Sequence, residues 1–397
     1  MKKYKICWVC TPLGTKGGII KRLKLWAKYI NKDKFDITLM FYTERENEFL
    51  QYFGSYPNVK LKYIKEIRNS VKSLLPGIYK LYQEFKSHNY DLIHSMFVWS
   101  DIYVGLASKI TGGQKILSYS AGSYLDFSAH FPFYFEIHKH PLQLIKTALK
   151  LFAAKTLFKL IKNQIRGFIV VSKCNKRDII KHGFPAARIY INKIGLDFEE
   201  FWVAKNKANA GKSLTFGWAG RMGKFKHGKG LDDVLQAFNS LTKDGHNNIK
   251  LLLAGDGINK SFWENKVSSL GLKQKAKFIG WTQNISDFFN KIDVFILPSF
   301  KEGTPRSILE AYYHNVPVIA TDVGGIPEIL ENTKTGFLVP YGNPDLLKEK
   351  MAYFINNPDE ARRMGTNARE YVVRNHDIKT EVSKLEDIYL NIIEDRY

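Results

Sequence analysis

Two glutamates, Glu302 and Glu310, lie eight positions apart beside residues that are suited to bind an anion. Residues 293–298 before them are apolar and typical of a buried parallel strand, and Thr304 and Pro305 suit the N-cap and first position of a helix. We therefore expect Glu302 on a loop and Glu310 on a helix. Amides at a helix start bind phosphate, whereas carboxylates accept hydrogen bonds from sugar hydroxyls. A nucleotide-sugar, with phosphate in its middle and polyols at both ends, fits this arrangement.

The same stretch resembles the E-x7-E signature of retaining glycosyltransferases of the GT-B fold, family 4. The wider context, Pro-Ser-x-x-Glu-Gly-x-Pro around Glu302 and Val-Pro-Val-Ile-Ala-Thr-Asp-Val-Gly-Gly-Ile-Pro-Glu over residues 316–328, strengthens this resemblance. Without that context, an exposed pair of glutamates on a helix would be the simpler interpretation. The resemblance implies that Glu302 contacts the donor sugar and that Glu310 contacts the ribose. Further donor contacts are expected from Gly303, Thr304 and Pro305.

A basic, glycine-rich stretch covers residues 220–230 between an apolar run and a helical pattern. Arg221 and Lys229 could clamp a diphosphate there, since an arginine can bind it through two parallel hydrogen bonds. The stretch resembles the family's Gly-Arg-x4-Lys-Gly motif with a loop three residues longer, so Lys224 or Lys226 could replace Lys229. The alternative is a solvated basic loop. We assign Arg221 and Lys229 to the leaving diphosphate.

Glycines also occur where other apolar runs end. Gly17 and Gly18 precede a helical pattern, and they would allow the backbone to approach a ligand closely. Gly255, Gly257 and Trp281 follow two later strand-like runs. The resemblance implies that the first glycine pair lies beside the donor phosphates and that the other three positions meet phosphate and base. Taken alone, the first pair fits an ordinary strand-to-helix turn.

Polar residues end two strand-like runs in the first half of the chain. His94 closes one of them, and we assign it a catalytic role near the two sugars; the alternative is a structural histidine. Ser120, Gly122, Ser123 and Tyr124 follow the next run, where small residues leave room for a substrate. We predict that these four residues bind the acceptor.

Strand-like and helical stretches alternate along nearly the whole chain of 397 residues. The strand-like runs cover residues 5–10, 35–42, 59–64, 91–97, 115–119, 167–172, 214–219, 249–254, 277–280, 293–297 and 316–320. Such alternation predicts doubly wound, mainly parallel sheets that bind ligands at the carboxyl ends of their strands. We expect an α/β protein of the GT-B fold, with two Rossmann-like domains facing across a cleft.

The length of the chain allows two domains with separate cores. We predict an N-terminal acceptor-binding domain over residues 1–197 and a C-terminal nucleotide-sugar-binding domain over residues 198–375. The polar residues 205–213 are expected to link them. Residues 376–397 are expected to form an amphipathic helix, which the resemblance implies would cross back to the first domain.

The net charge of +22 is unevenly placed, with +20 in residues 1–197 and +2 in residues 198–397. Residues 139–166 contain seven lysines and arginines and no acid. At 100° per residue, one helical face would carry Lys155, Lys159, Lys162 and Arg166. We expect a break or bend near residues 153–154 and a basic surface suited to an anionic bilayer. The alternatives are that the segment packs on the sheet or that the lysines only maintain solubility.

Other features of the sequence exclude one class of partner and indicate the cellular compartment. The chain lacks zinc-finger spacing, an RNP-like motif and a recognisable helix-turn-helix, so no nucleic-acid partner is expected. Three cysteines, Cys7, Cys10 and Cys174, cannot form a disulfide framework and indicate a reducing compartment. The apolar stretches are too short for export or for a bilayer span. We predict a cytoplasmic protein that can bind the inner face of the membrane.

Together these features predict a retaining glycosyltransferase that moves a sugar from a nucleotide-sugar, with UDP expected, to a glycan or lipid-linked acceptor. Bacterial surface polysaccharide or glycolipid assembly is the expected setting. An Asp-x-Asp motif is absent, so we assign no metal ligands and no cofactor. The family implies same-face attack, with the departing phosphate accepting the proton of the acceptor. The alternatives are a nucleotide-sugar epimerase of the same fold and a non-enzymatic basic module that binds nucleic acid or membrane.

Overall fold

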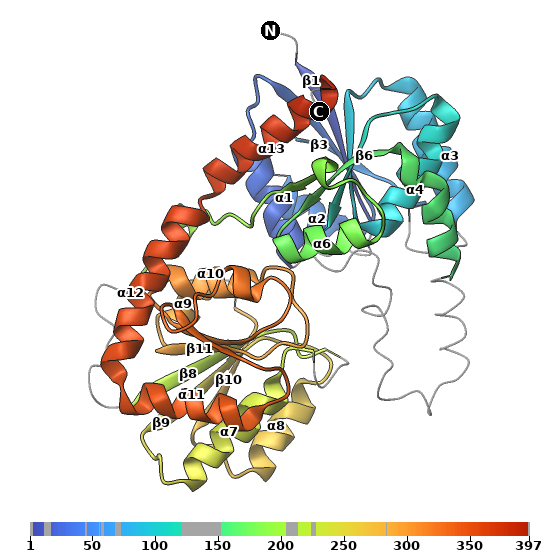
Figure 1. The fold of residues 1–397 in the computed structure, drawn as a ribbon. Helices are drawn as coiled ribbons and strands as arrows, with labels where there is room; N and C mark the ends of the chain where they lie inside the picture. The colour runs from blue at the N-terminus through green and yellow to red at the C-terminus, as the bar shows by residue number, and fades with distance from the viewer. Residues whose placement is uncertain are drawn as a thin grey trace. The chain divides into compact units, whose positions relative to one another are not determined.

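The structure is a computed structural model that describes residues 3–11, 17–43, 46–54, 56, 59–67, 73–120, 152–203, 213–223, 228–282 and 284–395. The chain divides into two compact units (Figure 1). Unit 1 comprises residues 1–194 and 378–397, and unit 2 comprises residues 195–377. These divisions fall beside the expected domain ends at residues 197 and 375.

Unit 1 is built on a seven-stranded parallel sheet. Across the sheet, the strands follow the order β3 (Val59–Tyr63), β2 (Phe35–Phe41), β1 (Tyr4–Cys10), β4 (Leu92–Met96), β5 (Ile116–Ser120), β6 (Ile165–Val170) and β7 (Ile189–Ile191). The chain runs from β1 towards one edge and then returns to continue from β4 towards the other. The carboxyl ends of β1 and β4 therefore form the switch point at which such sheets bind ligands.

Helices cover both faces of this sheet. One face packs against α1 (Gly18–Tyr29), α2 (Glu46–Phe53) and α13 (Ile378–Ile393), the red C-terminal helix in Figure 1. The other face packs against α3 (Leu74–Ser87), α4 (Phe97–Thr111), helical residues 152–161 and α6 (Lys173–Lys181). Short 3-10 turns, η4 (Lys162–Gln164) and η5 (Ala186–Arg188), complete the unit.

Strand β1 shows why the C-x-x-C spacing does not make a thiol site. Side chains alternate between the faces of a strand, so residues three apart lie on opposite sides. Cys7 belongs to one buried core and Cys10 to the other, and both thiols are free. Burial raises the pKa of both thiols. Cys7 and Cys10 are therefore buried residues that pack in separate cores.

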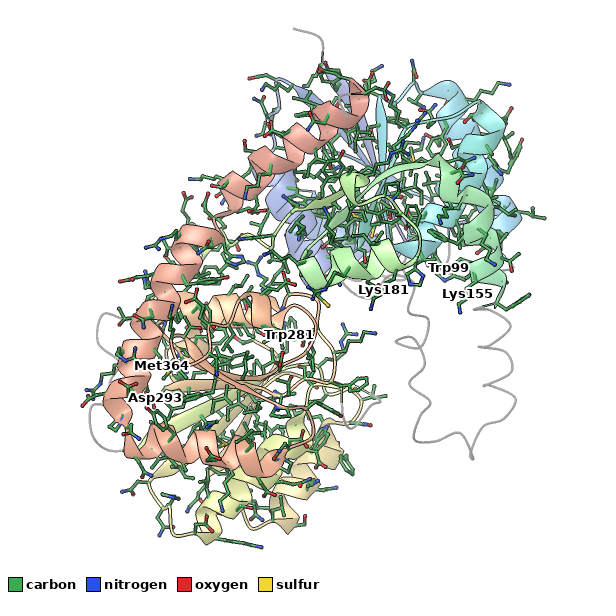
Figure 2. All side chains as sticks on the ribbon, viewed as in Figure 1. Trp99, Lys155, Lys181, Trp281, Asp293 and Met364 are labelled. Carbon is green, nitrogen blue, oxygen red and sulfur yellow. The ribbon has the colours of Figure 1, made fainter. Side chains whose placement is uncertain are left out.

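Unit 2 is built on a six-stranded parallel sheet. Its order is β10 (Ala276–Gly280), β9 (Ile249–Ala254), β8 (Leu214–Ala219), β11 (Val294–Leu297), β12 (Val318–Thr321) and β13 (Gly336–Val339). The switch point lies between β8 and β11. One face packs against α7 (Leu231–Lys243), α8 (Lys260–Ser269), α11 (Pro344–Asn356) and α12 (Pro358–Asn375). Met364 of α12 is buried in this core (Figure 2).

The other face of the second sheet packs against α9 (Ile285–Phe289) and α10 (Arg306–Tyr313). Phe289 of α9 makes an edge-on ring contact with Phe295 of β11, with 5.4 Å between the ring centroids. Ile308 and Leu309 of α10 are completely buried. Two 3-10 turns, η6 (Phe198–Glu200) and η7 (Ile326–Glu328), lie in the loops of this unit. Because Ile308 and Leu309 are buried, they anchor α10, the helix that carries Glu310.

The expected strands are found with small shifts of their ends, but β7 and β13 were not predicted. Each has only three or four residues and forms one edge of its sheet. So short a run contains too little alternation to identify a strand from sequence. Gly336 opens β13 with a φ of 153°, and a Cβ there would lie 1.9 Å from the carbonyl oxygen of Val318. Tertiary packing therefore determines β13.

The basic segment is only partly described. Residues 152–161 form one uninterrupted helix, so the chain continues as a helix through residues 153–154, where a break or bend was expected. The helix ends before Lys162, and Arg166 belongs to β6. Neither residue therefore adds to the basic face of the helix. Lys155 and Lys159 are exposed on the helix, as expected. Residues 121–151, which include the rest of the segment, and residues 204–212, which include all but the last residue of the expected linker at 205–213, lie outside the described residues.

Candidate functional site

Loops after β8, β9, β11 and β12 carry most of the predicted donor residues, and close backbone contacts hold them together. Gly255 has a φ of 134°, and a Cβ there would lie 1.9 Å from the carbonyl oxygen of Gly220. A Cβ at Gly257 would lie 2.1 Å from the carbonyl oxygen of Met222. The Met222 amide donates to the Asp256 carbonyl oxygen at 2.9 Å. Because only glycine fits at both contacts, the backbone on either side of Arg221 is held in place.

The loop that carries Glu302 is fixed in a similar way. Gly324, which follows β12, has a φ of 59°, and a Cβ there would lie 1.8 Å from the carbonyl oxygen of Glu302. The hydroxyl of Thr321 donates to the Ser299 carbonyl oxygen at 2.6 Å. These contacts connect residues 316–328 with Glu302. In the sequence, the two stretches were related only as parts of the same family pattern. They hold the Glu302 backbone at the carboxyl edge of the sheet.

Lys229 and Glu302 form an ion pair. The Lys229 Nζ lies 2.5 Å from the Glu302 Oε1, and the Glu302 side chain is 10% exposed. Trp218 Nε1 donates to the Lys229 carbonyl oxygen at 2.9 Å, which attaches the lysine to the end of β8. Gly230 follows with a φ of 66° and packs on the Pro298 backbone. The structure therefore brings together a cation and a carboxylate that are 73 residues apart in sequence.

Glu310 lies on α10, as expected, and its side chain is 7% exposed. Arg306 Nε donates to the Glu310 Oε1 at 2.9 Å. Arg306 was not assigned a role from the sequence. The i,i+4 spacing of the two residues is a signal that could have identified their contact. The second carboxylate of the signature is thus paired with an arginine of its own helix.

The start of α10 is one residue later than expected. Pro305 is the N-cap, with a ψ of 117°, and Arg306 is the first helical residue. The expectation that Thr304 caps the helix and that Pro305 is its first residue is therefore wrong. The extended backbone at Pro305 explains the shift. Gly303 and Thr304 still lie just before the N-cap, where the unpaired amides of the first helical turn could bind an anion.

Trp281 follows β10 and is half-exposed (Figure 2). The amide of Gly255 donates to the carbonyl oxygen of Gly280 at 2.8 Å, so the ends of β9 and β10 are joined. The ends of these strands therefore place Trp281 beside the glycine loop of β9. A half-exposed indole there is suited to stack on a nucleotide base.

In unit 1, Gly17 and Gly18 begin α1, after the carboxyl end of β1. Gly17 has a φ of 129°, which disfavours any side chain. A Cβ at either glycine would meet none of the described atoms within 4 Å. The pair therefore leaves open space at the switch point of the first sheet, and its role in binding phosphate remains a prediction.

His94 lies in the core of unit 1. Its ring is completely buried between Trp26, Tyr119 and Tyr389, and its Nδ1 lies 2.6 Å from the Tyr389 hydroxyl. Burial, together with the smaller effect of the nearby Arg22 guanidinium, lowers its pKa from 6.5 to about 3. These contacts fit a structural histidine, which was the alternative interpretation, and the catalytic role of His94 stays a prediction.

The predicted acceptor residues are only partly described. Ser120 is the last residue of β5 and is buried at the carboxyl edge of the sheet. Gly122, Ser123 and Tyr124 lie outside the described residues, as do Lys224 and Lys226 of the basic loop. The acceptor assignments therefore stay predictions.

One residue at the first switch point was missed. Phe97 follows β4 with a φ of 73°, in the left-handed region that bulky residues rarely adopt. Its ring contacts that of Tyr119, with 6.4 Å between the centroids. Backbone strain of this kind is concentrated at functional sites. No sequence pattern predicts this backbone strain, because it arises at the junction of a strand and a helix.

The described ranges contain no group of three or more His, Cys, Asp or Glu side chains that could hold a metal ion. None of the helices in the described part of the chain is long and apolar enough to cross a bilayer.

The chemistry available in unit 2 follows from these contacts. Arg221 and Lys229 follow β8 and supply positive charge at the carboxyl edge of the second sheet, and the amides that begin α10 follow β11 at the same edge. Glu302 and Glu310 supply two carboxylates, one on a loop and one on that helix. Cations and amides stabilise a departing anion, and carboxylates orient hydroxyl groups.

Two families match the chain. Residues 205–371 match the family described as glycosyl transferases group 1, and residues 16–200 match the family described as glycosyltransferase family 4. Together the two matches extend over most of the chain.

Individual proteins are similar as well. N-acetyl-alpha-D-glucosaminyl L-malate synthase of Bacillus anthracis is 32% identical over 171 residues, which are 43% of this chain and 44% of that protein. UDP-Gal:alpha-D-GlcNAc-diphosphoundecaprenol alpha-1,3-galactosyltransferase of Escherichia coli is 24% identical over 332 residues, 80% of each protein. Anabaena HepE in complex with UDP-glucose superposes with a TM-score of 0.76 at 18% identity, covering 96% of this chain and 98% of HepE. This likeness confirms the expected fold class.

Proposed function

Because the chain belongs to the group 1, family 4 glycosyltransferases of the GT-B fold, we propose that it transfers a sugar from a UDP-sugar to a glycan or lipid-linked acceptor. The observation that carries this proposal is the Lys229–Glu302 ion pair at the carboxyl edge of the second sheet. It places a carboxylate for sugar hydroxyls directly beside a cation for phosphate. Arg221 lies in the adjacent glycine-held loop.

The choice of UDP is supported by two of the similar proteins. HepE was solved with UDP-glucose, and the Escherichia coli relative is named for UDP-Gal. The half-exposed Trp281 is suited to the base of any nucleotide, so it supports nucleotide binding without selecting uracil. We assign Glu310 to the ribose hydroxyls and Glu302 to the donor sugar.

We propose that the reaction retains the configuration of the anomeric carbon. The bond between that carbon and the phosphate oxygen breaks, and the acceptor oxygen bonds to the carbon on the same face. The acceptor's proton passes to an oxygen of the departing diphosphate. Arg221, Lys229 and the first amides of α10 stabilise the negative charge that develops there. These groups supply the charge compensation that a divalent metal supplies in other transferases, so we propose that turnover is metal-independent.

The acceptor proposal rests on the basic surface of unit 1. Lys155 and Lys159 are exposed on the same helix as Phe152 and Leu160, which are 71% and 52% exposed. Exposed apolar side chains beside lysines suit the interface of an anionic membrane. The Escherichia coli relative is named for a diphosphoundecaprenol-linked acceptor. We propose that the acceptor is lipid-linked and reached at the membrane surface, in surface polysaccharide or glycolipid assembly.

Ligand-shifted melting tests the donor proposal. UDP, GDP, ADP and their common sugars are compared with and without Mg²⁺, for the wild type and Arg221→Ala. A nucleotide at 100 times its Kd should stabilise the protein by about 2.7 kcal/mol. We expect a shift with UDP that does not depend on Mg²⁺ and is reduced in the variant. The absence of a shift with every nucleotide would overturn the donor assignment.

The stereochemistry is tested on the product. Transfer from a UDP-sugar with a known anomeric configuration, followed by NMR of the new linkage, should show the same configuration. An inverted product would overturn the proposed same-face mechanism while leaving the donor assignment intact.

A further inference from the structure

Arg306 connects the predicted ribose carboxylate to a second part of unit 2. Its side chain is 12% exposed, and its Nε lies 2.9 Å from the Glu310 Oε1. Both residues belong to α10 and are separated by one helical turn. The contact therefore depends on the helix itself, and not on the surrounding loops.

The same guanidinium reaches the segment with which the chain enters unit 2. Arg306 Nη1 donates to the Gly195 carbonyl oxygen at 3.3 Å, and Nη2 lies 3.9 Å from the Glu200 Oε2. Gly195 is the first residue of unit 2. A planar guanidinium can hold a carboxylate and a carbonyl at once, whereas a lysine ammonium on its flexible stem is much less suited to do so.

Other contacts fix this entering segment within unit 2. The Leu196 amide donates to the His376 carbonyl oxygen at 2.8 Å. At the far end of α10, the Tyr313 ring stacks on that of Phe198, with 4.8 Å between the centroids. The segment is thus attached to α10 by Arg306 at its first residue and by Tyr313 at its last. Arg306 therefore holds Glu310 against a well-supported frame.

We propose that Arg306 is a positioning residue for the donor nucleotide, acting through Glu310; the proposal rests on the ribose role assigned to Glu310 above. A carboxylate close to a diphosphate is repelled by it, and the arginine offsets this repulsion. The charge-assisted bond also restricts the Glu310 side chain before the ligand arrives. Less conformational entropy is then lost on binding, which increases affinity.

The first test replaces Arg306 with methionine, which retains most of the apolar stem and removes the charge. UDP is the probe, or GDP or ADP if one of them gives the larger shift in melting. We expect the nucleotide Kd and the donor KM to rise about tenfold, with kcat changed less than about threefold, because ground-state and transition-state binding are weakened alike. A large fall in kcat at unchanged KM would overturn the proposal.

A double-mutant cycle separates positioning from a general structural role. Arg306→Met is measured alone and in a Glu310→Gln background. If Arg306 acts through Glu310, its substitution should change the nucleotide Kd by less than about twofold once the carboxylate is gone. Two independent, additive effects would overturn the proposal. Arg306→Lys retains the charge and is expected to have an affinity between those of the wild type and Arg306→Met.

Arg369→Met is the matched control. Arg369 donates to the Tyr313 carbonyl oxygen and lies over the Tyr313 ring, 4.3 Å from its centroid, at the opposite end of α10. Its loss weakens the support of the helix without removing the Glu310 partner, so the Kd should stay within about twofold of the wild type. An equal loss of affinity in this variant would identify Arg306 as merely structural.

The outcomes also distinguish the positioning role of Arg306 from the ribose role of Glu310, on which it rests. If Glu310→Gln leaves nucleotide binding unchanged, the ribose assignment fails, and the role of Arg306 fails with it. If Glu310→Gln weakens binding and Arg306→Met does not, only the role of Arg306 fails. Melting without ligand shows whether each variant is folded. If Arg306→Met is not folded, Arg306→Lys replaces it in the comparison with Glu310→Gln.

Discussion

At the scale of single residues, the site in unit 2 depends on charge pairs that are mostly shielded from solvent. Glu302 is 10% exposed, and Lys229 lies against it. A shielded carboxylate is stabilised by its partner cation, and removing either charge leaves the other without compensation. The pair therefore holds the Lys229 ammonium group and the Glu302 carboxylate beside each other, as the proposed transfer requires.

Glu302→Gln should lower kcat by at least about 100-fold, which corresponds to about 2.7 kcal/mol of transition-state stabilisation. The amide keeps the size of the side chain but loses the negative charge that pairs with Lys229 and accepts hydrogen bonds from the donor sugar. Transfer is measured with the nucleotide-sugar that gives the largest melting shift. Glu264→Gln, an exposed acid on α8, is the control and should turn over normally. Wild-type turnover in Glu302→Gln would contradict the assignment.

At the scale of elements, a buried carboxyl group connects α4 to two strands of unit 1. Asp101 of α4 is completely buried and accepts hydrogen bonds from the hydroxyls of Ser95 on β4 and Ser118 on β5, the latter at 2.9 Å. Burial raises the pKa of Asp101 from 3.8 to about 7, and the two serine hydroxyls oppose this change. The junction of α4 with the sheet is therefore sensitive to pH.

Asp101 makes a definite contribution to the pH dependence of stability. Between about pH 4 and pH 7 the folded protein retains the proton while the unfolded chain has lost it. The contribution of Asp101 to the free energy of unfolding therefore falls as pH rises through this range and then levels off. Asp101→Asn does not titrate, so its stability relative to the wild type should increase from pH 4 to pH 7. Urea unfolding at several pH values measures this difference, and a constant difference would contradict it.

His94→Gln is a control, because its effect on the pH dependence of stability has the opposite sign to that of Asp101→Asn. The folded protein keeps His94 neutral down to about pH 3, whereas the unfolded chain takes up a proton below its ordinary pKa of 6.5. The wild type therefore loses stability from His94 as pH falls from 6.5 towards 3, and the variant does not. Relative to the wild type, His94→Gln should become more stable as pH is lowered.

At the scale of the whole molecule, the charge is concentrated in one half of the chain. Residues 1–197 carry a net charge of +20 and residues 198–397 a net charge of +2. Glu302 and Glu310, the carboxylates that we assign to the donor, lie in the nearly neutral half, so the proposed donor site does not account for the positive charge. The proposed anionic acceptor or membrane partner of unit 1 would account for it.

Binding to vesicles tests this explanation. Vesicles of phosphatidylcholine with phosphatidylglycerol should bind the wild type, and added salt should weaken this binding. Each lysine near such a surface contributes about 1 kcal/mol, so Lys155→Glu with Lys159→Glu should reduce partitioning at least about tenfold. Lys243→Glu with Lys273→Glu, which alters exposed lysines of unit 2, is the matched control and should partition like the wild type. Equal binding to neutral vesicles, or preferential binding to duplex DNA, would contradict the proposal.

Local periodicity and turn residues were sufficient to predict the two parallel sheets, the loop position of Glu302 and the helical position of Glu310. The pairing of Lys229 with Glu302 depends instead on tertiary packing, since the loop contacts of Gly230 and Gly324 connect distant segments. Burial of His94 and strain at Phe97 likewise arise from packing between elements. Long-range contacts of this kind leave no periodic pattern in the sequence from which they could be predicted.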